Sequence, residues 1–204
     1  ADVLLVAARV LAAEPVEQVE LDELQRRTAD AAGTAANNTA VVFLGSLLVW
    51  TDHLAEGLVA EEAELHRAVV TGHVPAEANA LQNIADVYRR RGQWDDAEVA
   101  LRRWAELMTL IGGDPASEGT GADIAWLHAA RGRLDDATAL VTATIEQTKG
   151  VSIWQMHAHA HAGFVARLRG DLDAAHEHLQ LACASAEEVG IDDLGTLPFR
   201  DEVV

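Results

Sequence analysis

Basic residues are scarce in this sequence, and their scarcity bears directly on its partners. Among 204 residues, Lys and Arg number 15 against 33 Asp and Glu, so the formal net charge is −18. A surface this acidic repels phosphate groups. We therefore expect no direct contact with nucleic acid and no docking on an anionic membrane.

Cysteine and long apolar runs are almost absent as well. The single cysteine, Cys183, permits no internal disulfide and cannot build a cysteine-based zinc site. The longest apolar run, residues 40–50, falls well short of the ~20 residues that a membrane-spanning helix needs. The first residues, 1–5, lack the basic segment of a signal peptide. We expect a cytoplasmic protein, and because both ends look cut, a fragment of a longer chain.

Proline and alternating β-type patterns are also rare. Only four prolines occur, and runs rich in Val, Ile and Thr are missing, whereas the strong helix formers Ala, Leu, Glu and Arg are frequent. Segments with helical spacing are bounded by Gly, Pro and Asp. The sequence therefore predicts an all-α protein with helices near residues 2–13, 17–31, 36–50, 53–70, 76–91, 94–111, 119–131, 134–148, 152–169 and 172–189.

One turn signature recurs between these helices. Glycine begins the turns at Gly92, Gly132 and Gly170, and Asp52 begins a fourth; the starts at 52, 92, 132 and 170 give spacings of 40, 40 and 38. Glycine suits a left-handed helix end, and the acids that follow favour the start of the next helix. Two residues after each start lies a large apolar residue that we expect to fill the base of the hairpin: Leu54, Trp94, Leu134 and Leu172.

Small residues flank every one of these turns at fixed distances. Two helices can cross closely only where Gly or Ala lets them approach. The positions seven residues before and five residues after each turn start are Gly45 and Gly57, Ala85 and Ala97, Ala125 and Ala137, and Gly163 and Ala175. The alternative is a generic alanine-rich bundle in which small residues recur by composition.

The run Ala85, Tyr88, Gly92 and Ala97 resembles the tetratricopeptide repeat, in which these residue types occupy these places. The other copies have Leu48, His128 and Ala166 at the tyrosine position, the closing proline is missing, and the period exceeds the usual one. The resemblance implies a right-handed α-α superhelix of about five antiparallel hairpins. We expect a degenerate hairpin at 1–35, four repeats at 36–75, 76–115, 116–150 and 151–190, and a truncated repeat at 191–204.

A more specific resemblance lies near the C-terminal end. Residues 163–179, and the Gly turn, Pro-aromatic pair and acidic run of residues 189–204, are similar to the repeat region of large ATP-binding LuxR-type regulators related to the maltose activator. In that family the repeats act as sensor and interaction arms. The chain has no Gly-Lys-Ser/Thr phosphate loop and no basic recognition helix. The family's ATP and DNA sites therefore cannot be assigned to any residue here.

In tetratricopeptide-like hairpins the first helix lines the concave groove, and the repeat phase places a mixture of aromatic, amide and charged side chains there. Such a mixture suits a peptide, a protein or a small-molecule effector. The alternatives are that Trp50 and Trp126 belong to the core between repeats and that the polar residues are merely solvated. The groove candidates are Ser46, Trp50, Asn79, Gln82, Asp86, Arg89, Trp126, His157, Phe164 and Arg167.

Two further clusters carry possible chemistry. His157 and His161 are one helical turn apart and form a weak two-ligand candidate for a metal, although no His-Glu-x-x-His pattern surrounds them. Residues 89–91 are three consecutive arginines, which we interpret as charges that favour a helix C-terminus, with an acidic partner as the alternative.

We therefore expect a non-catalytic binding and sensing domain without a cofactor. The favoured context is the arm of a bacterial transcriptional regulator. The alternatives are a free-standing adaptor for a protein partner and a metal-dependent hydrolase built on His157 and His161. The apolar ends of a cut solenoid also permit a homo-oligomer.

Overall fold

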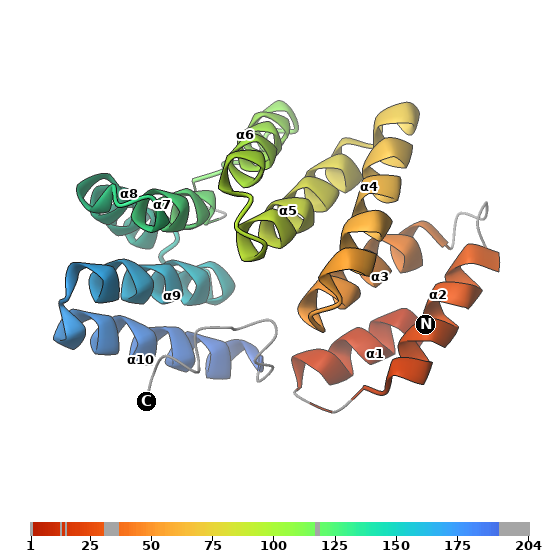
Figure 1. The fold of residues 1–204 in the computed structure, drawn as a ribbon, viewed down its shortest axis with the longest axis horizontal. Coiled ribbons are helices and arrows are strands. Elements are labelled where there is room, and N and C mark those ends of the chain that lie inside the picture. Colours follow the sequence, from red (N-terminus) through yellow and green to blue (C-terminus); the bar gives the residue numbers. More distant parts are fainter. Residues whose placement is uncertain (1, 13, 15, 31–36, 117–118, 192–204) are drawn as a thin grey trace. The chain divides into compact units, whose positions relative to one another are not determined.

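The computed structural model describes residues 2–12, 14, 16–30, 37–116 and 119–191, and the regular structure of these residues is entirely helical (Figure 1). Each predicted helix is present, with ends within two residues of the prediction. The predicted repeat at 191–204 lies almost entirely outside the described residues. The helices are α1 (Asp2–Leu11), α2 (Gln18–Asp30), α3 (Asn37–Trp50), α4 (Leu54–Thr71), α5 (Val74–Arg90), α6 (Trp94–Leu110), α7 (Thr120–Ala130), α8 (Leu134–Gln147), α9 (Ser152–Arg169) and α10 (Leu172–Val189).

The chain divides into two compact units, residues 1–111 and 112–204. In the first unit α3 pairs with α4, α4 with α5 and α5 with α6, and α3 also packs on α5. In the second unit α7, α8, α9 and α10 repeat this arrangement, with α7 against α9. Within each unit, two consecutive hairpins therefore stack so that their first helices are neighbours.

The first helix of each of these four hairpins ends in the same way. The residue that begins the turn has a positive φ: 65° at Asp52, and 74°, 78° and 80° at the three glycines of the signature. The next backbone N–H donates to a carbonyl five residues earlier, at 2.8 to 3.0 Å, and these acceptors are Leu48, Tyr88, His128 and Ala166. This pair of features closes a helix in a Schellman motif. The glycines are thus confirmed as left-handed helix ends, and Asp52 replaces one of them.

The start of α5 differs from the prediction, which placed it after Pro75. The helix begins at Val74, so Pro75 lies in its first turn. Proline is tolerated there because the N–H groups of the first turn have no partner within the helix. The His73 Nδ1 accepts a hydrogen bond from the Ala76 N–H at 3.2 Å and satisfies one of them.

All eight small residues that flank the turns are buried. The space beside two of the glycines is filled by a side chain of the second helix. A Cβ at residue 163 would lie 2.7 Å from the Leu179 Cγ, and one at residue 45 would overlap the carboxyl group of Glu61. The small residue therefore makes room for a side chain 16 positions later.

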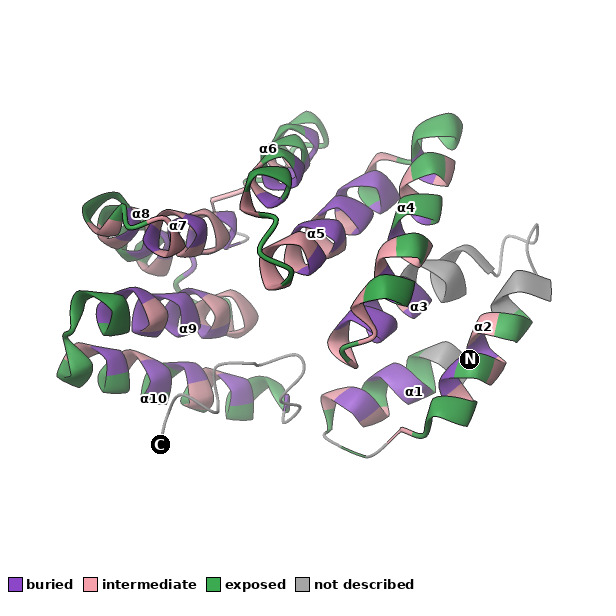
Figure 2. Cartoon of the chain, in the orientation of Figure 1, coloured by how far each residue is buried: buried purple, intermediate pink, exposed green. Residues whose placement is uncertain are grey.

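Burial follows the hairpin pattern. Buried residues run along α5 and α9, whereas α4, α6 and α10 each expose a continuous side (Figure 2). In the second unit the core consists of small and branched side chains of α7, α8 and α9, with Val165 and Val141 at 2% and 3% exposure. The expectation that Leu172 fills the base of its hairpin is wrong, because 67% of this residue is exposed.

The N-terminal helices α1 and α2 both pack on α3. Val6 and Val10 of α1, and Leu21 and Leu24 of α2, share one apolar cluster with Leu44, Leu47 and Leu48 of α3. Arg9 also donates to Glu20 at 2.8 Å, which joins α1 to α2. The first unit therefore has its own apolar core at this end of the chain.

The predicted arginine cluster at residues 89–91 stabilises the end of the neighbouring helix α3 as well as the end of its own helix, α5. Arg89 and Arg90 lie in the last turn of α5 and both pair with Asp86. Arg90 also donates to the Val49 carbonyl and to the Asp52 carboxylate, each at 2.8 Å. Its guanidinium thus holds the last turn of α3 and the left-handed residue that follows.

Replacing Arg90 by methionine is therefore expected to lower the free energy of unfolding of the first unit by about 1–2 kcal/mol, because the Val49 carbonyl loses a charged donor. The measurement is urea unfolding followed by circular dichroism. Arg91→Met, at the exposed neighbouring position, is the control. Equal losses in the two variants would show that Arg90 has no special role at the end of α3.

Candidate functional site

The two first helices of the second unit, α7 and α9, meet through pairs of side chains separated by a constant distance in sequence. The Trp126 and Phe164 rings stack with centroids 4.9 Å apart and planes at 16°. Three residues earlier on each helix, the His161 Nε2 lies 3.6 Å from the Asp123 Oδ1. Both pairs span 38 residues, the spacing of the last two turns. The repeat phase thus aligns α7 with α9.

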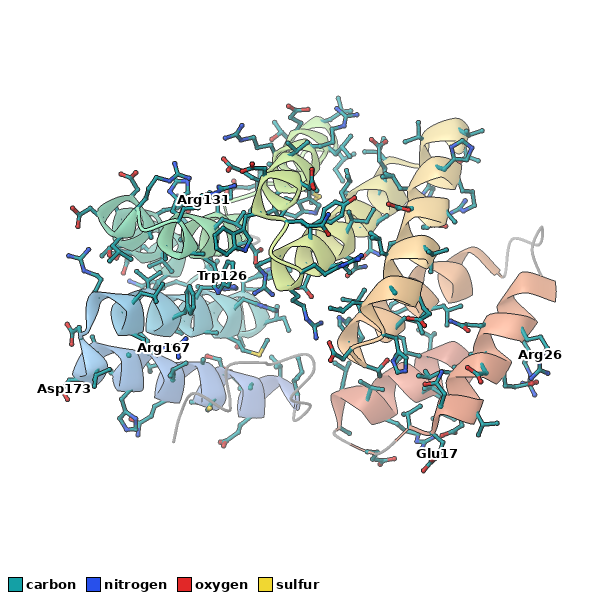
Figure 3. All side chains as sticks on the ribbon, in the orientation of Figure 1. Glu17, Arg26, Trp126, Arg131, Arg167 and Asp173 are labelled. Carbon is teal, nitrogen blue, oxygen red and sulfur yellow. The ribbon has the colours of Figure 1, made fainter. Side chains whose placement is uncertain are left out.

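Arg167 extends the aromatic stack at the solvent side. Its guanidinium carbon lies 5.6 Å from the centre of the Phe164 ring, within cation–π range. Trp126 and Phe164 are half-buried, and Arg167 is exposed; Trp126 and Arg167 are labelled in Figure 3. We call Trp126, Phe164 and Arg167 the aromatic surface. Three of the predicted site residues therefore come together on two helices.

Trp126 also makes the contact between repeats that was considered as the alternative to a groove position. Its ring packs on the next repeat through Phe164, yet part of it stays accessible. An aromatic residue in this position is held rigidly by the core and presents one side to solvent. Such residues contribute strongly to binding because little conformational freedom is lost when a partner docks.

The predicted groove residues of the first unit do not form a comparable set. Ser46 was expected to face the groove, but it is 5% exposed, and its hydroxyl accepts a 2.8 Å hydrogen bond from Asn83 inside the unit. Trp50 is half-buried against the apolar cluster of α1, α2 and α3. Asp86 and Arg89 pair with each other. Asn79 and Gln82 are half-buried, and the Asn79 Nδ2 is a buried donor without a partner among the described residues.

A buried acid lies at the centre of this first unit, and no motif had drawn attention to it. Glu61 of α4 is fully buried; Asn83 donates to its Oε1 at 2.9 Å, and its Oε2 has no partner within the described part of the chain. Burial, and the charge of Glu64, raise the pKa of Glu61 to about 8, against the opposing hydrogen bonds from Asn83 and Ser46. The carboxyl group is therefore largely protonated at neutral pH.

Alignment of the repeat copies could have identified Glu61 as a buried acid. The position nine residues after each turn start is occupied by Glu61, Leu101, Val141 and Leu179. In the other three copies this residue is apolar and 2% to 4% exposed. An acid at a position that is apolar in three aligned copies is a buried acid, and the sequence carries that signal once the copies are aligned.

His157 and His161 point to different partners. The His161 Nδ1 donates to the His157 backbone carbonyl at 2.8 Å, and its Nε2 faces Asp123. The His157 ring lies against Trp154, with centroids 5.9 Å apart. The described residues contain no cluster of three or more His, Cys, Asp or Glu able to hold a metal ion. A second histidine contact, between His159 and His178, was not predicted.

Comparisons with known proteins agree with this architecture. The family profile described as tetratricopeptide repeat matches residues 78–106, which span α5 and α6 and contain the most complete copy of the motif. A search of curated proteins found no match. The structure is similar to a crystal structure of nearly identical TPR-like repeats of a Podosopora anserina protein designated as a kinesin light chain, with a TM-score of 0.56, 14% identity, and coverage of 93% of this chain and 98% of that one.

These findings confirm the predicted fold class. The chain is all-helical in its described part, the hairpin of α5 and α6 matches the tetratricopeptide repeat family, and the fold is similar to that of tetratricopeptide-like repeats. No described helix is both long and apolar enough to cross a membrane. The chain thus contains a tetratricopeptide-like repeat region, a helical fold suited to protein–protein interaction.

Proposed function

We propose that this chain is a non-catalytic protein-binding arm, and that the aromatic surface of α7 and α9 is where its partner docks. The observation that carries the proposal is the Trp126–Phe164 stack with Arg167 beside it. Trp and Arg are the residue types most enriched where binding energy concentrates. Here they are placed on packed helices rather than loops, so that they are ordered before a partner arrives.

The chemistry of the aromatic surface indicates the kind of segment it binds. The half-buried rings offer apolar contact area, and the Arg167 cation stands at their edge. A peptide segment that places an apolar side chain on the rings and a carboxylate near Arg167 would match both features. The rest of the chain is strongly acidic and repels the carboxylate of such a peptide, because like charges repel. This repulsion disfavours binding elsewhere on the chain and so adds selectivity for the position beside Arg167.

Trp126→Ala is expected to weaken binding of such a peptide at least about tenfold, because the central ring of the surface is removed. Peptides are first selected from a displayed library against the whole chain, and their Kd values are then measured by fluorescence anisotropy. Trp94→Ala, which removes a half-buried tryptophan of α6, is the matched control. Equal loss in both variants, or none in Trp126→Ala, would contradict the proposed surface.

We further propose that the arm belongs to a LuxR-type transcriptional regulator and acts as its sensor in the cytoplasm. This context rests on the resemblance of residues 163–179 and 189–204. Sequencing the reading frame on both sides of the chain tests it. A phosphate-loop module upstream and a basic helix-turn-helix module downstream are the expected result; start and stop codons at the present ends would instead make the chain a free-standing adaptor.

A further inference from the structure

Two histidines from the two helices of the last hairpin are in direct contact. The His159 Nδ1 of α9 lies 3.1 Å from the His178 Nδ1 of α10, and the ring centroids are 5.3 Å apart. A hydrogen bond between two imidazole nitrogens requires one protonated and one unprotonated nitrogen. The contact is therefore compatible with two neutral rings, and it is lost when both rings are charged, because both nitrogens are then donors.

This contact lies close to a point where α9 and α10 pack tightly. Gly163 is one turn along α9 from His159, and Leu179, which fills the space beside Gly163, follows His178 on α10. His159 is 8% exposed and His178 is half-buried. Neither helix can shift at this level to separate two charged rings without disturbing the contact between Leu179 and Gly163.

The charges around the pair do not compensate for protonation. Burial lowers the pKa of His159 below its ordinary value, and a charge on His178 would lower it further; burial also lowers the pKa of His178. Glu177 acts in the opposite direction on both rings but is the weaker influence.

Three titratable groups of α7, α8 and α10 have partners other than the histidine pair. On α7, Asp123 faces His161, and on α8, Asp135 accepts from Arg169 at 2.7 Å. On α10, the exposed His176 contacts Gln180 at 2.8 Å. The described groups that act electrostatically on His159 are thus His178 and Glu177, both on α10.

We propose that the His159–His178 pair is a pH-sensitive latch, which holds α10 against α9 at neutral pH and releases it in mildly acidic solution. The unfolded chain binds protons at the ordinary histidine pKa, whereas the folded pair resists them. The stability contributed by the pair is therefore complete above about pH 6.5 and is lost as the pH falls through the lowered pKa values. The proposal of a latch does not rest on the binding role proposed above.

Hydrogen exchange of α9 and α10 amides, corrected for intrinsic rates at pH 7.5 and 5.5, tests the latch. In the whole chain, acidification is expected to accelerate corrected exchange in these helices roughly threefold or more. His178→Gln, which leaves no second charge to oppose His159, should reduce that acceleration to less than half. His176→Gln on the same helix is the matched control and should respond as the unsubstituted chain does.

A second measurement does not depend on the variants folding. Titration of the imidazole Cε1–H resonances in the unsubstituted chain should place the midpoints of His159 and His178 below the ordinary histidine value of about 6.5. The same acceleration in His178→Gln as in the unsubstituted chain, or midpoints of His159 and His178 at the ordinary histidine value, would overturn the latch.

Discussion

Replacing Glu61 by glutamine should stabilise the first unit at pH 8 by roughly 1–3 kcal/mol. The folded unit raises the pKa of Glu61 from 4.5 to about 8, so it holds a proton that the unfolded chain releases. The penalty for this proton begins above pH 4.5 and grows until about pH 8. Glutamine is neutral throughout and keeps an oxygen for the hydrogen bond from Asn83.

The measurement is urea unfolding at pH 5 and at pH 8. The gain in stability from Glu61→Gln should be large at pH 8 and small at pH 5. Below about pH 4.5 the Glu61 carboxyl group is protonated in the folded and in the unfolded chain, so the penalty disappears there. Glu62→Gln removes an exposed charge from the adjacent position of α4 and serves as the control. If Glu61→Gln shows the pH profile of the control, the side chain is ionised in the folded unit and the burial argument fails.

Substituting valine at Gly163 should destabilise the second unit by roughly 2–4 kcal/mol, because the added carbon atoms overlap a buried leucine. A Cβ there would lie 2.7 Å from the Cγ and 2.8 Å from the Cδ2 of Leu179, and 3.3 Å from the Ala175 carbonyl oxygen. Leu179 is 2% exposed, so its side chain is enclosed by the core and cannot turn into solvent. Relief therefore requires α9 and α10 to separate.

Hydrogen exchange resolved by helix measures this effect within the second unit. Protection should fall in α9 and α10. Ala184→Val introduces valine on the exposed side of α10 and controls for a β-branched residue in a helix; helix propensity by itself ranks valine above glycine. Unchanged protection in Gly163→Val would mean that α9 and α10 pack less closely than the structure shows.

The sequence predicted the hairpins well because their signals are local. A left-handed residue, an acid in the next turn and a small residue at a fixed distance each depend on a few neighbouring positions. Asp52 was recognised as a substitute for glycine because it stands 40 residues before Gly92 and is followed by the same local pattern. Pro75 was misjudged because a residue that ends one helix also suits the first turn of another.

The functional site was predicted less completely, because the elements that pack against a helix determine which of its sides is exposed. The repeat phase placed Trp126 and Phe164 on the first helices of two successive hairpins, and their rings stack in the structure. Ser46 was placed at the surface although it faces Asn83 inside the unit. The contact between His159 and His178 could not be foreseen, since the rotation of α10 relative to α9 is set by tertiary packing rather than by the sequence of either helix.

The constant offset of 38 residues between partners on α7 and α9 bears on how this chain can vary during evolution. The intervening α8 buries Ala137, Val141 and Thr144, at helical intervals. One residue inserted between Val141 and Thr144 would turn every later position of α8 by about 100° and expose what is now buried. Substitutions can accumulate in this helix, whereas length changes are confined to the turns, so homologues should align across α8 without gaps.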